Sequence, residues 1–336
     1  SLSLFNWDFG DGSSSSANNA NKNFSGFGNQ NVTLTATSAL GCSDSNTKSV
    51  YVAPNPTVNF STASECLSDS VSFETQSSIA LGSVAQHSWD FGDGNVSSLP
   101  DAKHLYMAAA DYTITYTTTS DLGCSTSSTQ TISVYPEPNA SFVHDTIYTD
   151  QSTSFVNTSS ISNGNLSYNW NFGDGSLSTL TNPSHTFADS GSYSISLLTQ
   201  SSFGCTDTVF EHVILPKAHF SANEVCFGEA TFFQNQSAVP FGTLSYEWTF
   251  GDGATSTQTN PSHTYSSAGT YTASLVAISN QDHKSVFDST IVVKALPNPD
   301  FSFSHTCDTV AMAFSNNSSP LSTSSYEWTF GSEGTS

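Results

Sequence analysis

A six-residue motif of the form Trp-x-Phe-Gly-Asp-Gly recurs along the chain at nearly constant spacing and constrains the fold more than any other feature. Four full copies and a fifth, degenerate copy begin at Trp7, Trp89, Trp170, Trp248 and Trp328, 78 to 82 residues apart. The chain has five tryptophans, so all of them occupy this one position, where we expect a repeated core residue. Self-similarity at a fixed period indicates tandem structural units, here of about 80 residues each.

Other residues repeat with the motif and mark the unit boundaries. A proline lies four residues before a phenylalanine near the start of each unit, at Pro56/Phe60, Pro138/Phe142, Pro216/Phe220 and Pro297/Phe301. The predicted division is the C-terminal half of a repeat at 1–52, complete repeats at 53–135, 136–215 and 216–295, and the N-terminal half of a repeat at 296–336. We therefore expect the parent chain to continue in both directions. Short, proline-rich junctions predict stiff connections between the units.

Aromatic residues alternate around each motif tryptophan, as in Tyr168, Trp170 and Phe172. Residues two apart on a strand share a face, so these large rings are expected to point inward. Aromatic residues make up 12% of the chain, which excludes an intrinsically disordered protein. About seven short strands per unit, with a buried tryptophan on the third, predict an all-β chain of tandem immunoglobulin-like, seven-stranded β-sandwiches in a linear array.

The motif is followed by Asn-Pro-Ser-His-Thr-Phe at 182–187 and Asn-Pro-Ser-His-Thr-Tyr at 260–265, and then by Gly-x-Tyr. Together these segments resemble the polycystic kidney disease (PKD) domain over essentially the whole chain. The resemblance implies an extracellular β-sandwich that serves as a spacer or adhesion module. Tandem bacterial copies are similar to the repeat regions of Bacteroidota surface adhesins, including those of gliding species, and other copies accompany chitinases and collagenases.

The charge of the chain excludes several classes of partner. Asp and Glu number 28 against 6 Lys and Arg, for a net charge of −22. Binding to nucleic acid needs basic residues that contact phosphates, so no nucleic-acid partner is expected. No apolar run approaches the ~20 residues of a membrane span, so no membrane insertion is expected in this segment.

The motif aspartates are candidates for either a turn or a metal site. In the first interpretation, Asp11, Asp93, Asp174 and Asp252 are turn residues whose carboxylates accept backbone N–H bonds between two glycines. The alternative is calcium, but a second acid three residues earlier exists only at Asp8 and Asp90, and calcium loops supply about six to eight oxygens. Asp8, Asp11, Asp90 and Asp93 are therefore weak calcium candidates, and no other cofactor is expected.

A histidine also recurs once per unit, at His104, His185 and His263, with Lys22 at its place in the first unit. Histidines about 80 residues apart in separate units cannot converge on one metal ion, so a structural role is expected. The chain contains no recognisable nucleophile, zinc or phosphate-binding motif. We therefore expect that the segment is not an enzyme.

The six cysteines occupy two positions of the repeat. The early position, in the first loop, holds Cys66, Cys226 and Cys307, and the late position, before the last strand, holds Cys42, Cys124 and Cys205. In a sandwich of alternating strands these two positions lie at opposite ends of one unit, too far apart for the ~7 Å Cα separation of a disulfide. Pairing of an early cysteine with the late cysteine of the next unit predicts a Cys66–Cys205 disulfide. The same rule leaves the remaining four to pair with repeats outside this chain.

An Asp-Ser/Thr pair followed by an apolar residue or Thr places possible O-glycans on Ser70, Thr146, Thr208, Ser289 and Thr309. The pattern is similar to a Bacteroidota O-glycosylation sequon, and the alternative is chance in a chain rich in Ser and Thr.

Two functions fit these features. The first is a segment of a large secreted bacterial protein at the cell surface, attached at the outer membrane, that acts as a stiff stalk or filament presenting a distal adhesive tip. Its partners would be the neighbouring repeats of the same chain and a surface polysaccharide or another cell-surface protein. The alternative is an array of carbohydrate- or matrix-binding accessory modules of a secreted hydrolase, which an exposed row of aromatic rings would favour.

Overall fold

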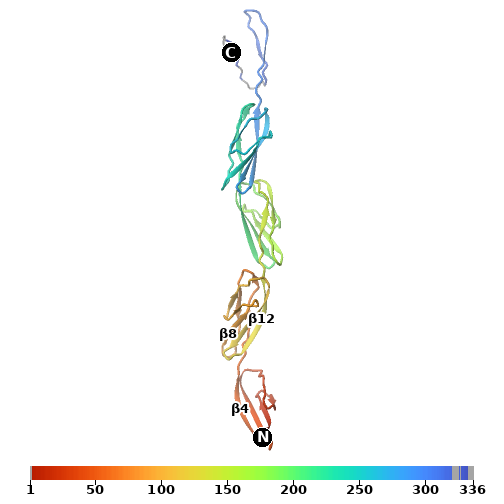
Figure 1. Cartoon of the computed structure of the whole chain (residues 1–336), viewed down its shortest axis with the longest axis vertical. Helices are drawn as coiled ribbons and strands as arrows, with labels where there is room; N and C mark the ends of the chain where they lie inside the picture. The colour runs from red at the N-terminus through yellow and green to blue at the C-terminus, as the bar shows by residue number, and fades with distance from the viewer. Residues whose placement is uncertain (1, 320–324, 326, 332–336) are drawn as a thin grey trace. The chain divides into compact units, whose positions relative to one another are not determined.

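The computed structural model describes residues 2–319, 325 and 327–331, and all of its named elements are β-strands (Figure 1). The all-β prediction is therefore confirmed. The chain divides into two compact units, one of residues 1–139, 160–167 and 199–207 and the other of residues 140–159, 168–198 and 208–336. None of the described residues forms a helix long and apolar enough to cross a membrane.

Residues 1–52 form one antiparallel sheet, and residues 53–135 form a sandwich of two sheets. The first sheet has the order β2-β1-β3-β4, with β1 (Leu2–Asp8), β2 (Ser14–Ser15), β3 (Gly28–Ser38) and β4 (Ser43–Val52). The sandwich packs β10-β7-β5 against β6-β12-β11-β8-β9. Its strands are β5 (Phe60–Ser61), β6 (Glu65–Cys66), β7 (Val71–Thr75), β8 (Val84–Asp90), β9 (Val96–Ser97), β10 (Ala102–His104), β11 (Asp111–Ser120) and β12 (Ser125–Tyr135).

Residues 136–215 repeat this arrangement with sheets β13-β14-β17 and β16-β15-β18-β19. The strands are β13 (Phe142–His144), β14 (Ser152–Asn157), β15 (Leu166–Asn171), β16 (Leu177–Ser178), β17 (Ser184–Thr186), β18 (Gly191–Ser201) and β19 (Thr206–Leu215).

Residues 216–295 form sheets β20-β22-β25 and β21-β27-β26-β23-β24. The strands are β20 (Phe220–Ala222), β21 (Val225–Cys226), β22 (Thr231–Asn235), β23 (Leu244–Thr249), β24 (Thr255–Ser256), β25 (Ser262–His263), β26 (Gly269–Ser279) and β27 (Lys284–Lys294). Beyond them, β28 (Phe301–Phe303) pairs with β29 (Phe314–Asn316).

Each complete repeat has its own hydrophobic core, built around the motif tryptophan. Trp89 and Trp170 are 0% exposed and Trp248 is 1% exposed, and each lies in a separate cluster made of residues from its own repeat. The indole N–H of each donates to a backbone carbonyl ten residues later, those of Leu99, Leu180 and Gln258, at 2.9 to 3.0 Å. The indole therefore contributes apolar burial and also anchors the short hairpin strand that follows the motif turn.

Trp7 and Trp328 differ from the three central tryptophans, because both are only partly buried. The described residues around Trp7 form one sheet, and those around Trp328 supply only the strand pair β28–β29. Without a second complete sheet to pack against, the motif tryptophan cannot be enclosed.

Candidate functional sites

The Gly-Asp-Gly turn that follows each motif tryptophan is built around the aspartate carboxylate. In the 53–135 repeat, Asp93 Oδ1 accepts the backbone N–H of Asn95 at 3.0 Å. Gly92 and Gly94 both have positive φ, at 79° and 92°, where glycine carries no steric penalty. Asp174 and Asp252 accept the N–H of Ser176 and Ala254 in the same way. These contacts are those of a turn residue.

The second carboxylate oxygen of the turn aspartate is paired with the recurrent histidine. The Oδ2 atoms of Asp93, Asp174 and Asp252 lie 2.7 Å from the Nε2 atoms of His104, His185 and His263, respectively. Each imidazole also stacks on the motif phenylalanine, with ring centroids 4.4 Å apart for Phe91–His104, 4.1 Å for Phe172–His185 and 4.5 Å for Phe250–His263. The histidine therefore links the turn to the edge of the core.

The electrostatics of these pairs keep the carboxylates charged. Partial burial by itself would raise the pKa of Asp93, but hydrogen bonds from His104 and Asn95 outweigh it and hold the pKa below its usual value. Burial would likewise raise the pKa of Asp252, but hydrogen bonds from His263 and Ala254 lower it. Beneath this turn, burial and the Asp252 charge raise the pKa of Tyr265 to about 12, so its hydroxyl stays protonated and donates to the Phe250 carbonyl at 3.0 Å.

Lysine replaces histidine at this place in residues 1–52. Lys22 Nζ lies 2.7 Å from Asp11 Oδ2 and 5.7 Å from the centroid of the Phe9 ring. Hydrogen bonds from Lys22 and Ser13 lower the pKa of Asp11 to about 2. Lys22 therefore pairs with the turn aspartate and contacts the ring of the motif phenylalanine, as the histidine does in the other repeats.

The calcium candidates are engaged in these local contacts. Asp8 and Asp90 each accept the N–H of the glycine two residues later, Gly10 and Gly92, at 3.0 Å. Asp11 and Asp93 are paired with Lys22 and His104. Within the described part of the chain, no group of three or more His, Cys, Asp or Glu side chains could hold a metal ion.

The structure contains a disulfide between Cys66 and Cys205, the pairing expected from the sequence. Their Cα atoms are 5.7 Å apart, and 139 positions separate the two residues in the chain. Tyr135 stacks on Phe203 close by, with ring centroids 4.4 Å apart and an interplanar angle of 4°. Residues of the 53–135 and 136–215 repeats are therefore linked by a covalent bond and by an aromatic contact. Cys42, Cys124, Cys226 and Cys307 carry free thiols.

The junction between the 136–215 and 216–295 repeats has a histidine where the preceding one has a cysteine. His283 takes the late position, is 6% exposed, and accepts the N–H of Ile147 through Nδ1 at 3.4 Å. His144 lies beside it, with ring centroids 5.9 Å apart, and its Nε2 is 3.1 Å from Glu211 Oε1. Burial and the charge of His144 lower the pKa of His283. Gln281 adds a hydrogen bond from the Ile214 N–H to its side-chain carbonyl at 2.8 Å.

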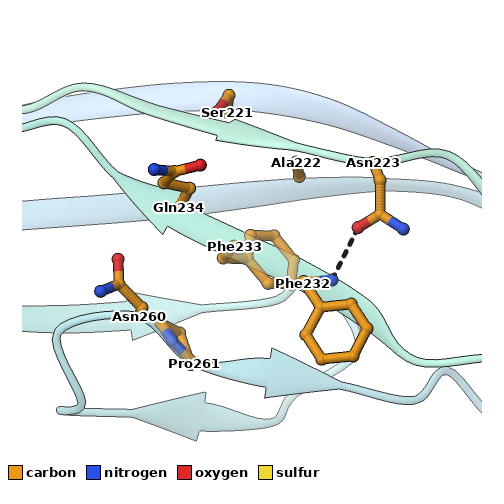
Figure 2. A pocket seen from close by; sticks show the side chains of 8 residues that line it. All are labelled: Ser221, Ala222, Asn223, Phe232, Phe233, Gln234, Asn260 and Pro261. Atoms are coloured by element: carbon orange, nitrogen blue, oxygen red, sulfur yellow. Dashed lines mark hydrogen bonds between the residues drawn. The ribbon is translucent and has the colours of Figure 1, made fainter.

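Sequence reasoning assigned the repeating aromatic residues to the core and missed several exposed rings, among them Phe232. Phe232 on β22 is 65% exposed, whereas the adjacent Phe233 is 2% exposed. An open groove of about 580 Å³ lies beside it. Figure 2 shows the side chains that line this groove, which are Ser221, Ala222, Asn223, Phe232, Phe233, Gln234, Asn260 and Pro261. The alternation of a strand, applied to Thr231-Phe232-Phe233, could have found it, because only one of two adjacent rings can face the core.

The possible O-glycosylation residues lie mostly at the surface. Ser70, Thr146, Thr208 and Thr309 are exposed, and Ser289 is half-buried on β27. Their modification remains a prediction, which the intact mass of the natural protein would check.

Two-sheet sandwiches repeated along the chain, each with its own tryptophan-centred core, define a tandem series of immunoglobulin-like domains. The sequence profile of the PKD domain matches residues 2–54, 52–134, 135–214 and 215–295. The chain therefore belongs to the PKD domain family.

Similar proteins include two collagenases and a domain of known structure. A microbial collagenase of Vibrio alginolyticus is 40% identical over 88 residues, which span 25% of this chain and 11% of the collagenase. Collagenase ColA of Bacillus cereus is 40% identical over 60 residues, which span 18% of this chain and 6% of that protein. The PKD1 domain of the Vibrio cholerae metalloprotease PrtV is 35% identical, with a TM-score of 0.23, over 25% of this chain and 98% of the domain. The chain thus matches only a small part of the length of either collagenase.

Proposed function

We propose that this chain is a non-catalytic accessory array of a secreted bacterial hydrolase and that it holds the enzyme on an extracellular polymer. The observation that carries the proposal is the 40% identity to segments of two collagenases, because those segments are only 11% and 6% of the collagenases' length. Such a short matched part suits an accessory domain attached to a separate catalytic region.

An extracellular location is part of this proposal. The Cys66–Cys205 disulfide supports it, because disulfides persist in oxidising compartments and are rare in the cytosol. The net charge of −22 also suits a protein that must stay soluble outside the cell without adhering to its own copies.

The test is a co-sedimentation assay with the oxidised chain and insoluble polymers. We expect saturable binding to at least one of fibrillar collagen, chitin and microcrystalline cellulose, with agarose beads as the inert control. Absence of binding to every polymer would reject the accessory function. An assay of the same chain for hydrolysis of each polymer should show no turnover, and any turnover would contradict the non-catalytic role.

A second candidate function is the stiff stalk of a cell-surface adhesin, which presents a distal adhesive tip. The specific observation in its favour is the disulfide that links residues of successive repeats, because a stalk gains from covalently restrained junctions. In that case the partners are the neighbouring repeats and a surface polysaccharide or cell-surface protein at the tip. If the chain is a stalk, it should not bind these polymers itself, so the same co-sedimentation assay separates the two functions.

A further inference from the structure

The outer face of the three-stranded sheet in the 216–295 repeat carries an exposed aromatic ring. The sheet consists of β20, β22 and β25, and Phe232 and Gln234 on β22 point away from the core. Phe232 lies opposite Ser262, and Gln234 lies opposite Ser221. Around the exposed Phe232 ring, the groove is lined by the Ser221 hydroxyl and three side-chain amides, and also by apolar groups of Ala222, Phe233 and Pro261 (Figure 2).

Two asparagines at the margins of this face are held in defined orientations. Asn223 Oδ1 accepts the N–H of Phe232 at 2.8 Å, as the dashed line in Figure 2 shows. Asn260 Oδ1 accepts the N–H of Asn235 at 2.8 Å. Because each side-chain carbonyl is occupied by a backbone donor, the amide nitrogen of each is left as the group that can donate to a ligand.

No charged side chain lines the groove. The net charge of the whole chain is −22. Anionic ligands would meet long-range repulsion from the rest of the surface, and cationic ligands would find no carboxylate on this face to pair with. A ligand that suits the face is therefore neutral, with an apolar side for the ring and hydroxyl groups for the amides.

The strand register identifies the equivalent positions in the other two complete repeats. Asn235 pairs with Phe220 as Thr75 pairs with Phe60 and Asn157 pairs with Phe142. By this register, Phe232 corresponds to the serines Ser72 and Ser154. Gln234 corresponds to Glu74 and Val156, and Asn223 corresponds to Ala63 and Asp145. The ring and the neutral amides therefore occur together in the 216–295 repeat and in neither of the other two.

We propose that this face, the groove around Phe232, binds a neutral polysaccharide. A pyranose ring presents a face of C–H groups that stacks on an aromatic ring, and its hydroxyls accept hydrogen bonds from amide N–H groups. A few placed polar groups beside an apolar contact are what fix the orientation of a ligand in a site. The inference rests on the proposed accessory function and names the polymer class and the residue that would contact it.

The experiment compares the oxidised chain with a Phe232→Ser variant in depletion assays on chitin and on microcrystalline cellulose. This substitution installs the residue found at the equivalent positions 72 and 154, and it touches an exposed side chain, so the fold should be retained. We expect binding to weaken about tenfold or more, which corresponds to about 1.4 kcal/mol. Phe232→Trp, which enlarges the ring, should restore binding to at least the original level.

The matched control is Phe241→Ser, because Phe241 is 68% exposed in the same repeat but lies outside the groove. It should bind as the unaltered chain does, and thermal unfolding of every variant should show an intact fold. If Phe232→Ser binds polysaccharide as tightly as Phe241→Ser, the inference is wrong even though the accessory function stands. Binding to collagen alone would also overturn the inference and leave the accessory function in place. Binding to no polymer would reject both.

Discussion

The residues of the repeated motif lie within a few positions of one another, and each stabilises the fold in a different way. Trp248 fills the core and anchors the next strand through its indole N–H. The Asp252 carboxylate closes the turn with one oxygen and contacts His263 with the other. The two glycines differ, because a Cβ on Gly251 would lie 2.5 Å from the Thr272 carbonyl oxygen, whereas a Cβ on Gly253 would meet nothing within 4 Å.

This difference between the glycines gives a prediction. Gly251→Ala and Gly253→Ala both place alanine at positive φ, which costs about 1–2 kcal/mol. Only Gly251→Ala adds a backbone clash, so we expect it to destabilise the 216–295 repeat by about 1–3 kcal/mol more than Gly253→Ala. Urea unfolding of the two variants measures the difference, and equal unfolding midpoints would contradict it.

The turn aspartates also predict a response to acid. The pKa values of Asp93, Asp174 and Asp252 are lowered below the ordinary value of 3.8. A carboxyl group with a depressed folded-state pKa contributes stability above its unfolded-state pKa and loses it as the pH falls through the folded-state value. The urea midpoint of the 136–215 repeat should therefore fall as the pH drops below about 3.8.

Asp174→Asn is the variant that tests this assignment. The asparagine keeps an acceptor for the Ser176 N–H but cannot titrate, so the acid-induced fall in stability should become shallower. Glu247→Gln, on an exposed side chain of the next repeat, controls for the loss of one negative charge. An unchanged acid dependence in Asp174→Asn would show that other groups govern it.

The sequence indicated the turn role of the aspartates but not their pairing with the histidines. The glycines on both sides indicated a turn from the sequence alone, because Gly and Asp both favour turn conformations. His185 is 11 residues from Asp174, and the two meet only because β17 runs back beneath the turn beside β14. That contact depends on tertiary packing, which local patterns do not encode.

At the scale of strands and junctions, the two complete repeat-to-repeat connections use different chemistry. One has the Cys66–Cys205 disulfide and the Tyr135–Phe203 stack. The other has the buried His283, the His144–Glu211 contact and the hydrogen bonds of Gln281. The missing cysteines were visible in the sequence, but the histidine cluster that takes their place was not, because its members come from positions 144, 211 and 283.

The histidine junction should be sensitive to mild acid. Burial and the nearby His144 lower the pKa of His283 below 6.5, while Glu211 and Asp282 oppose the shift. The neutral form is favoured in the folded chain, so its stabilisation is complete above pH 6.5 and declines as the pH falls towards the folded-state pKa. Protonation of Nδ1 also removes the acceptor of the Ile147 N–H.

Amide hydrogen exchange measures this effect directly. After correction for the intrinsic pH dependence, exchange of the Ile147 amide should accelerate as the pH falls from 7.5 to 5, and Lys284, which donates to the Ile147 carbonyl, should follow. His283→Gln, which retains a polar side chain but does not titrate, should remove the pH dependence. The Leu67 amide, bonded to the Tyr135 carbonyl in the 53–135 repeat, serves as the reference.

At the scale of the whole molecule, the complete repeats have separate hydrophobic cores, and residues of successive repeats are joined by a disulfide or by hydrogen bonds. Each of the three complete sandwiches closes its own hydrophobic cluster, so each should fold around its own tryptophan. The all-β class and the tandem repetition of the domains followed from the periodic motif, since a fixed period of this length demands repeated units. The exposed Phe232 was missed although strand alternation could have found it, because Phe233 is equivalent to the buried Phe73 and its neighbour must then face outward.

The disulfide predicts a defined mechanical difference. A pulled chain cannot extend the 139-residue segment between Cys66 and Cys205 while the bond is intact. At about 3.4 Å per extended residue, reduction should release about 470 Å of additional contour length. Single-molecule force spectroscopy with and without dithiothreitol measures this release. Cys66→Ser/Cys205→Ser should reach the longer length in either condition, and an unaltered chain that does so without reductant would contradict the prediction.

The placement of the cysteines limits how a gene for such a chain can grow or shrink. The 53–135 repeat carries both Cys66 and Cys124, so a duplicated copy could supply a partner to each neighbour. The 136–215 repeat carries only the late cysteine, and the 216–295 repeat only the early one. If the pairing rule inferred from the sequence holds for every repeat, duplication or loss of either one alone would leave a cysteine without a partner. We therefore expect unequal recombination in this region to duplicate or delete those two repeats together, whereas a repeat of the 53–135 type can be duplicated alone.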